Sequence, residues 1–332
     1  MPRPATRNGY AATDIPPPVR IAHFNNWANV AWTLSRAQRA LGHEAVVYEL
    51  WGNPYGFPAD VRVGFRGPTL WNYQMARRAR EFASFDVLHV HGGIRWQEPA
   101  YPLFAGLFGK TLAVHLHGTE TRAGYGRHYL AAADVIFAST PDLREHVPAA
   151  AWLPNPIDLS ALPAPGPPNE PPRFGHFVSS PVHKGTEAVV AAFRVAFPDA
   201  QVSEEGTRTR YRARDAELLV VFRAPHAEAL ALMASCDAVV DQIAPYGIYG
   251  VVAIEAMALG KPVLASHRPG WYPGCPVVRI GGDTAAEEMR ALAADPARRR
   301  RLGAEGRAYV ERVHAASVVA ARTVDAYRSA RG

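Results

Sequence analysis

Residues 249–267, YGVVAIEAMALGKPVLASH, contain the pattern that decides the fold. Behind a glycine, residues 249–260 carry apolar side chains at helical spacing, and the apolar run that follows, 261–267, is typical of a buried strand. The run DAVVDQI, residues 237–243, predicts another strand just before them. Strand, helix and strand in this order form a βαβ unit, which predicts a parallel sheet.

The same alternation continues outward from this stretch, back to Val19 and forward to about residue 281. Further strands are predicted at residues 20–24, 44–50, 86–93, 111–118, 134–140, 173–180, 217–224 and 276–281. Further helices are predicted at residues 32–42, 71–82, 126–133, 141–147, 185–197 and 226–236, and from residue 284 the chain is predicted to be helical to its end.

Residues 160–172, SALPAPGPPNEPP, interrupt the alternation with six prolines. Proline cannot continue a helix or a central strand, so we interpret this segment as a linker between two domains. The sequence thus predicts the α/β class, with two Rossmann-like, doubly wound parallel-sheet domains that face each other across a cleft. The predicted parts are a disordered tail (1–18), a first domain (19–160), the linker (161–172), a second domain (173–312) and a last helix (313–332).

Composition restricts the class of protein. The 332 residues are 48% hydrophobic and 20% charged, as in ordinary globular proteins, and the length favours two domains. The net charge of +6 is compatible with an anionic ligand or with a peripheral contact with a membrane. The run Arg298 to Arg301 lies in a helical stretch without aromatic residues, so we interpret it as a solvated helix face and expect no nucleic-acid partner.

Cysteine usage and apolar runs bear on location. Cys236 and Cys275 are too few for a disulfide framework, which fits a reducing cytoplasm. The chain has no run of 18 apolar residues and no signal-peptide pattern. We therefore expect a cytoplasmic protein, freely soluble or peripheral at the inner membrane face, and leave open whether it is a monomer or a homodimer.

Polar residues that follow strands are candidate ligand contacts, because open α/β domains bind ligands at the carboxyl ends of their strands. Gly250 opens a helix, so backbone N–H groups can approach a diphosphate, and Glu255 can accept both hydroxyls of a ribose. The alternative is an ordinary helix start with a solvent-facing glutamate. Lys184, in the context HKGT, suits a pyrophosphate as a point charge, and the alternative is a surface lysine.

The first domain offers a loop that can face the same cleft. This loop, FNNWANVAW, links a strand to a helix with small and amide-bearing residues. It lacks a glycine-rich fingerprint such as GxGxxG, so the signal is weak on its own. The candidate cleft residues in it are Asn25, Asn26, Trp27 and Ala28.

Two neighbouring strands end in pairs of histidines, His89 with His91 and His115 with His117. Alternation directs both members of a pair to one sheet face, beside buried valines and leucines, so we expect core histidines rather than metal ligands. His117, last on its strand, is expected to point into the cleft as a neutral hydrogen-bonding group or proton relay. No Asp-x-Asp occurs, so we expect no metal and no cofactor.

The chain resembles the GT-B glycosyltransferases of family 4 over nearly its whole length. The resemblance is carried by HGTETR, ADVIFASTPDLREHVP, WLPNPIDL, HKGTEAVVAAF, EAMALGKPVLA and ADPARRRRLGAEGRAYVERVH, of which EAMALGKPV and WLPNPID are the most specific. It implies two Rossmann-like domains, a nucleotide held mainly by the second, and a C-terminal helix that crosses back onto the first. It also implies sugar transfer without metal and with retention of anomeric configuration.

Carried over by position, the resemblance implies that Lys184 contacts the donor diphosphate and Glu255 the ribose. Gly250 and Val251 would offer N–H groups to the distal phosphate, His117 would approach the donor sugar, and the loop from Asn25 to Ala28 would close the cleft.

Two positions depart from the family pattern. The glutamate expected eight residues before Glu255 is Gly247, and the arginine expected five or six residues before the lysine is replaced by Val178 and Ser179. One sugar contact and one phosphate charge are thus missing. Other groups would then hold the sugar, and the candidates are Tyr246, Tyr249, His91, Glu120 and Arg122.

Three hypotheses follow: an active transferase, a nucleotide-sugar epimerase or similar GT-B enzyme, and a non-catalytic binder or partner subunit. We favour the transferase. Its expected partners are a UDP-sugar donor, with a GDP-sugar next, and an acceptor hydroxyl on a glycan, a lipid-linked saccharide or a small molecule. Loop aromatics at residues 51–57 and Trp96 lie where an acceptor would bind.

Overall fold

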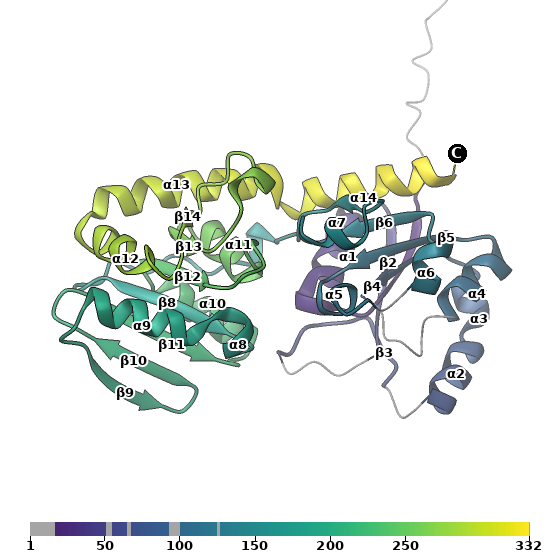
Figure 1. The fold of residues 1–332 in the computed structure, drawn as a ribbon. Helices are drawn as coiled ribbons and strands as arrows, with labels where there is room; N and C mark the ends of the chain where they lie inside the picture. The colour runs from purple at the N-terminus through teal and green to yellow at the C-terminus, as the bar shows by residue number, and fades with distance from the viewer. Residues whose placement is uncertain (1–16, 51–54, 65–67, 93–99, 125–126, 332) are drawn as a thin grey trace, which may run out of the picture.

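The computed structural model describes residues 17–50, 55–64, 68–92, 100–124 and 127–331. Two α/β units lie side by side, each built on its own seven-stranded sheet, and the last helix runs from the second unit along the first (Figure 1). The predicted α/β architecture of two doubly wound sheets is therefore confirmed. The predicted N-terminal tail up to residue 16, Trp51 and Trp96 lie outside the described residues.

The first sheet is parallel in all its pairings and has the order β3-β2-β1-β4-β5-β6-β7. The order reverses at β1 and β4, which is where ligands bind in doubly wound sheets. Its strands are β1 (Arg20–Phe24), β2 (Glu44–Glu49), β3 (Val61–Arg62), β4 (Val87–His91), β5 (Thr111–Leu116), β6 (Val135–Ala138) and β7 (Ala151–Trp152). Its helices are η1 (Trp27–Asn29), α1 (Val30–Ala40), α2 (Pro68–Arg77), α3 (Ala79–Phe82), α4 (Ala100–Phe108), α5 (Thr119–Arg122), α6 (Arg127–Ala132) and α7 (Leu143–His146).

The second sheet has the order β14-β13-β12-β8-β11-β10-β9 and reverses between β8 and β12. Its strands are β8 (Arg173–Val178), β9 (Gln201–Glu205), β10 (Arg208–Arg212), β11 (Glu217–Phe222), β12 (Ala238–Gln242), β13 (Val263–Ala265) and β14 (Val278–Arg279). The helices around it are α8 (Pro181–Lys184), α9 (Thr186–Ala196), α10 (His226–Ala234), α11 (Val251–Ala258), η3 (Pro269–Trp271), α12 (Ala285–Ala294) and α13 (Pro296–Val313), and η2 (Leu159–Ala161) precedes it.

Helix α14 (Ala316–Arg331) joins the two units. It follows α13 after His314, whose Nδ1 donates to Asn155 O and whose Nε2 lies 2.9 Å from the Tyr249 hydroxyl. Apolar residues of α14 such as Val319 and Tyr327 pack with Leu34 of α1 on one face of the first sheet. This face would be exposed without α14, so burial of apolar area holds the helix against the first unit.

Several elements differ from the sequence-based expectation. The segment predicted as one helix at residues 71–82 forms α2 and α3, and α4 was not predicted. β9 and β10 form an antiparallel hairpin at the edge of the second sheet, where a purely parallel sheet was expected. Every residue of β9 is exposed, so the hairpin lacks the buried apolar face from which strands are recognised.

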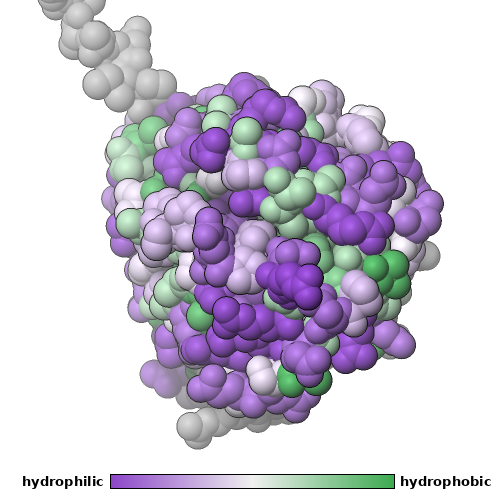
Figure 2. Space-filling model, turned by 90° about the vertical axis from the view of Figure 1, so that its left-hand side faces the viewer, coloured by the Kyte–Doolittle hydropathy of each residue, from purple (hydrophilic) through white to green (hydrophobic). Residues whose placement is uncertain are grey.

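The hydropathy of the surface and the length and apolar character of the helices are the features relevant to membrane contact. The outer face of the second unit is largely hydrophilic, with hydrophobic residues in small separate patches (Figure 2). Across the described ranges, no helix has both the length and the apolar character needed to cross a bilayer.

Candidate functional site

A cavity of about 70 Å³ lies between the two units at the N-terminus of α11. Three residues named from the sequence line it together, Ala28 from the first unit and Val251 and Glu255 from the second. The remaining lining residues are Asn29, Thr33, Pro156, Ile157, Asp158, Ala161, Leu162, His226, Leu230 and Ile254. The structure therefore brings the loop after β1 opposite the N-terminus of α11.

Glu255 is held by a histidine that the sequence analysis missed. His226 Nε2 lies 2.6 Å from Glu255 Oε1, and the Glu255 side chain is only 12% exposed. Burial disfavours the charged imidazole, but the hydrogen bond to Glu255 and its charge outweigh this, and the pKa of His226 is raised above its usual 6.5. The pair fixes one carboxylate oxygen and leaves the other oxygen able to accept hydrogen bonds.

Lys184 and Gly250 meet at a single buried carboxylate. Lys184 Nζ lies 2.5 Å from Asp241 Oδ1, and the backbone N–H of Gly250 donates to Asp241 Oδ2 at 2.5 Å. Asp241, on β12, is fully buried. An ammonium group has three donors, so Asp241 orients Lys184 at the α11 N-terminus while leaving donors for an anion.

A side chain at position 250 would displace this ammonium. A Cβ atom at position 250 would lie 2.7 Å from Lys184 Nζ and 3.2 Å from Asp241 Oδ1. The absence of a side chain therefore lets Lys184 and Asp241 approach the first turn of α11.

An arginine from another strand lies beside the segment in which this chain lacks the arginine that the resemblance implies. Arg223, directly after β11, donates from Nε to Ser179 O at 3.3 Å, and Ser179 is one of the two residues that replace the expected arginine. Arg223 has φ of 49°, a left-handed conformation that is strained for arginine. Arg223 is exposed, and its contact with Ser179 places it beside the end of β8. The chain continues from Ser179 into α8, which carries Lys184.

The loop after β1 is strained and tightly bonded. Asn25, Ala28 and Asn29 have φ of 70°, 50° and 61°, which non-glycine residues rarely adopt and which cluster at functional sites. Asn26 donates to Pro58 O and accepts from the N–H of Trp32, so its side chain shapes the loop. Trp27 is 43% exposed. Of the four loop residues named from the sequence, Ala28 lines the cavity.

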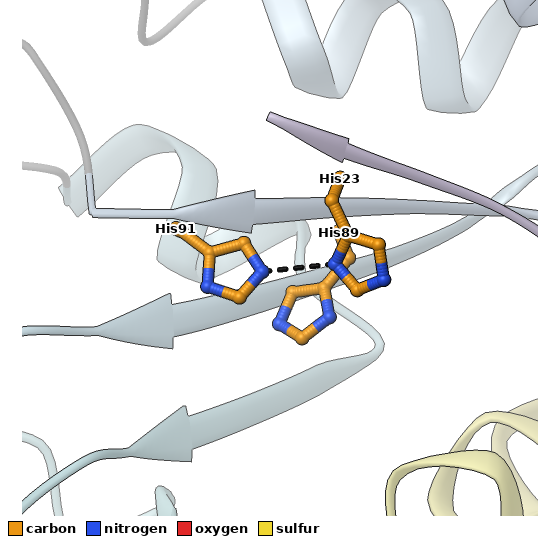
Figure 3. A group of neighbouring side chains, drawn as sticks. All are labelled: His23, His89 and His91. Atoms are coloured by element: carbon orange, nitrogen blue, oxygen red, sulfur yellow. Dashed lines mark hydrogen bonds between the residues drawn. The ribbon is translucent and has the colours of Figure 1, made fainter. Parts of the chain in front are cut away.

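His117 ends a hydrogen-bonded chain of histidines. His23 Nδ1 lies 2.9 Å from His91 Nε2, and His91 Nδ1 lies 3.2 Å from His117 Nε2. Figure 3 shows His23, His89 and His91 gathered on one face of β1 and β4. Burial lowers the pKa of His117 to about 3, so its imidazole is neutral. His91 is fully buried and reaches the cleft only through His117.

Glu120 and Arg122 shape the turn after β5. Glu120 Oε1 accepts from the N–H of His117 at 2.7 Å and from that of Gly118 at 3.3 Å. Arg122 bonds to Asp142 through Nε and Nη2. These contacts fix the backbone around His117.

Arg122, from the first unit, contacts Tyr246 of the second unit, and Gly247 lies within the second unit beside Arg268. The Arg122 guanidinium stands 4.8 Å from the centre of the Tyr246 ring, a cation–π contact between the two units. Gly247 has φ of 69°, and a Cβ there would lie 2.8 Å from Arg268 Cγ. The position where the family carries a glutamate is thus covered by an arginine side chain.

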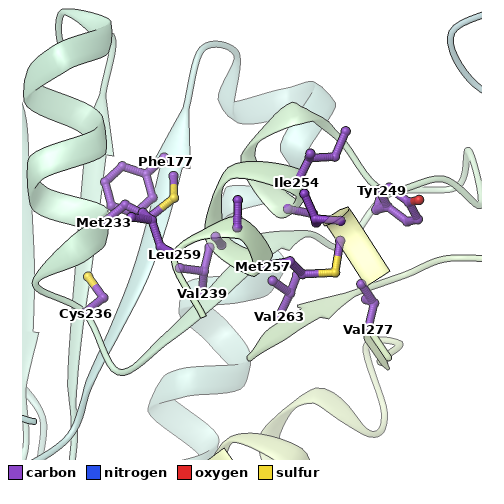
Figure 4. Close-up of a cluster of buried hydrophobic side chains, with 14 of the residues drawn as sticks. Phe177, Met233, Cys236, Val239, Tyr249, Ile254, Met257, Leu259, Val263 and Val277 are labelled. Carbon is purple, nitrogen blue, oxygen red and sulfur yellow. The ribbon is translucent and has the colours of Figure 1, made fainter. Parts of the chain in front are cut away.

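Tyr249 lies in the core of the second unit, among Ile254, Met257 and Val277 (Figure 4). It is 3% exposed, and its hydroxyl bonds to His314 Nε2 at 2.9 Å. The sequence placed Tyr249 among the donor contacts, whereas the structure shows a core residue that anchors the connection to α14.

Among the described residues, two groups of side chains are close enough together to hold a metal ion, and both consist of histidines. One group is His23, His89 and His91, and the other is His91, His115 and His117. His23 was not singled out from the sequence, because one histidine in an apolar strand gives no signal by itself.

Comparison with known proteins identifies the fold. The chain superposes on HepE of Anabaena in complex with UDP and glucose with a TM-score of 0.68 and 13% identity, over 94% of this chain and 100% of that chain. AviGT4, a glycosyltransferase involved in avilamycin A biosynthesis, gives a TM-score of 0.56 and 21% identity, over 94% and 97% of the two chains. The protein has the GT-B fold. No family profile and no curated protein matches the sequence.

Proposed function

We propose that the protein is a glycosyltransferase that moves a sugar from a nucleotide-sugar, a UDP-sugar first and a GDP-sugar next, to an acceptor hydroxyl. One observation carries the proposal: Glu255 and the α11 N-terminus face the loop after β1 across a cavity that both units line. The similarity to HepE, whose complexes contain UDP and UDP-glucose, supports the choice of UDP.

The proposed roles follow from the contacts. Lys184, held by Asp241, and the N–H group of Val251 stabilise the diphosphate as it departs, while Gly250, whose N–H donates to Asp241, leaves room for the ammonium. Arg223 adds the positive charge that the missing arginine would supply. Glu255, fixed by His226, accepts the ribose hydroxyls through its free oxygen.

His117 acts from the other side of the cleft. Its neutral ring hydrogen-bonds to the donor sugar or relays a proton as the bond to phosphate breaks. The turn that carries it is fixed by Glu120, and Arg122 with Tyr246 links that turn to the second unit. These residues are proposed to shape the sugar and acceptor side of the site.

We further propose that transfer needs no metal and retains the anomeric configuration. The Lys184 ammonium and the N-terminus of α11 already lie together at the proposed diphosphate position. Glu255 is assigned to the ribose and Asp158 accepts from the N–H of Ser160, so we assign neither carboxylate as a nucleophile and propose that the acceptor attacks the sugar on the face from which the phosphate departs.

The size of the cavity implies domain movement. A volume of about 70 Å³ holds a few water molecules and is far smaller than a nucleotide-sugar. We propose that the two units open to admit the donor and close over it, which also excludes water from the reaction.

The test is UDP release from UDP-sugars and release of GDP from GDP-sugars, with and without a panel of acceptors, in EDTA. The proposal expects release with one donor, unchanged by EDTA and at least tenfold slower in Lys184→Met. Glu228→Gln, which alters a surface pair with Arg208, is the matched control for a lost charge. Binding of a donor without turnover would favour a non-catalytic binder, and loss of activity restored by Mn²⁺ would exclude metal independence.

A further inference from the structure

The cluster formed by His23, His89, His91, His115 and His117 contains buried ring nitrogen atoms that have no hydrogen-bond partner. His115 is fully buried, and neither of its ring nitrogens has a partner among the residues that the structure describes. Leaving buried polar atoms unpaired is costly, typically about 1 to 3 kcal/mol for each group. Such a ring calls for a ligand that accepts a nitrogen lone pair.

Three rings surround one point at the end of β4 and β5. The ligand nitrogens of His91, His115 and His117 lie within 4.8 Å of one another, and His91 Nδ1 is 3.2 Å from His117 Nε2. Two imidazole ligands of a tetrahedral Zn²⁺ are about 3.3 Å apart, given Zn–N bonds of about 2.0 to 2.1 Å. The ring planes are mutually tilted by 34°, 45° and 36°, so their in-plane lone pairs can converge.

A chain of hydrogen bonds presents the His91 lone pair to this point. Thr323 Oγ1 donates to Ala320 O and so must accept from Gln38 Nε2, which turns Gln38 Oε1 toward His23. His23 therefore donates through Nε2 and accepts at Nδ1 from His91 Nε2. The proton of His91 is thereby held on Nε2, and its Nδ1 lone pair faces His117.

This chain has the form of the outer shell of a metal site. Histidine ligands of metals almost always donate their second ring N–H to a fixed acceptor, which orients the ring. His91 does so toward His23, which in turn donates to Gln38. On metal binding His117 would keep its neutral charge by carrying its proton on Nδ1, which leaves Nε2 for the metal.

The neighbouring group of His23, His89 and His91 does not fit a metal as well. The rings of His89 and His91 are stacked 4.2 Å apart with planes only 24° from parallel, which suits ring stacking better than ligation of one ion by both rings (Figure 3). All three side chains are also fully buried. In the outer group His117 is partly exposed, which gives an entry path and an open fourth position for water.

From this geometry we infer that His91, His115 and His117 bind one divalent transition metal ion of the class that prefers imidazole, such as Zn²⁺ or Co²⁺. The site is separate from the diphosphate position at Lys184. Resting on the proposed function, a second consequence follows: metal bound to His117 withdraws that side chain from the sugar, so added metal inhibits transfer by the metal-free protein and EDTA reverses only that inhibition.

Metal binding is measured on the untagged full-length chain with Co²⁺, whose visible absorption reports four-coordinate ligation, and with Zn²⁺ by competition. The expected result is one equivalent bound to the wild type and an affinity about 100-fold weaker in His115→Leu, which removes a ligand without adding a cavity. His89→Leu, a change of the same kind on the same sheet face, is the control and should bind like the wild type. Folded fractions come from melting curves.

Gln38→Leu is a second variant that leaves all three ligands in place, and loss of an outer-shell partner should weaken binding about 10- to 100-fold. Absence of a Co²⁺ spectrum in the folded wild type would overturn the proposal. So would binding that survives in His115→Leu and is lost in His89→Leu, because it would place the metal in the inner group. These measurements need no substrate, so they are independent of whether the protein transfers sugar.

Discussion

Replacing Glu255 by glutamine tests the nucleotide site most directly. Glutamine keeps the shape of the side chain and an oxygen for His226, and it removes the charge that the ribose hydroxyls would meet. A hydrogen bond to a charged group contributes about 1.5 to 3 kcal/mol and a neutral one about 0.5 to 1.5 kcal/mol, so the exchange costs about 1 kcal/mol per hydroxyl. For two ribose hydroxyls this is about 2 kcal/mol, or about 30-fold in the Kd of UDP.

The expected change in the Kd of UDP applies because Glu255 is largely shielded from solvent. The Glu255 side chain is 12% exposed, so solvent weakens its interactions little. Isothermal titration of UDP against wild type, Glu255→Gln and the control Glu228→Gln measures the effect. The side chains of Arg208 on β10 and Glu228 on α10 are 36% and 39% exposed, so loss of this pair should leave the Kd unchanged.

Two results would contradict this reasoning. An unchanged Kd in folded Glu255→Gln would place the carboxylate outside the nucleotide site. An equal loss of affinity in Glu228→Gln would show that titration senses net charge rather than a specific contact. A 2′-deoxy nucleotide refines the test, since it lacks one of the hydroxyls and should bind wild type more weakly while Glu255→Gln discriminates less.

Three further predictions concern neighbouring groups. Because the folded pKa of His226 is raised above 6.5, its pair with Glu255 adds stability that is fully present below pH 6.5 and is lost as the pH rises through the raised pKa. The difference in unfolding free energy between wild type and His226→Gln, measured by urea titration, should therefore shrink over that range. A difference that stays constant with pH would contradict this prediction. Arg223→Gln should weaken UDP several-fold, more at low salt, and leave uridine unaffected; equal losses for both ligands would exclude a phosphate contact. His117→Asn should lower kcat and kcat/KM together while the Kd of UDP stays near wild type, whereas wild-type turnover per folded molecule would assign it to packing.

The fold could be predicted to the extent that its strands are buried. Runs such as RIAHF and the apolar part of DAVVDQI became β1 and β12, because apolar runs between helical patterns leave few alternatives to a parallel sheet. The hairpin of β9 and β10 could not be found in this way, since its residues are exposed or partly exposed and largely charged. Its position is determined by pairing with β11, which periodicity does not encode.

The candidate site could be predicted only one residue at a time. Lys184, Gly250 and Glu255 follow strands, so their positions alone suggest ligand contacts. Their partners are distant in sequence: Asp241 lies 57 residues from Lys184, and His226 lies 29 residues from Glu255. An aspartate at the end of a strand and a histidine at the start of a helix have many possible roles, and only the fold shows which carboxylate or ammonium each one meets.

The C-terminal helix connects the architecture to the chemistry of the cleft. Thr323, on α14, holds the amide of Gln38, although 285 residues separate them. If Thr323 moved away, the amide could turn over and present Nε2 to His23, and every proton along His23, His91 and His117 would shift to the opposite ring nitrogen. The packing of α14 on α1 therefore determines which nitrogen of His117 carries its proton at the cleft, so the element that joins the two units also sets whether that ring donates or accepts there.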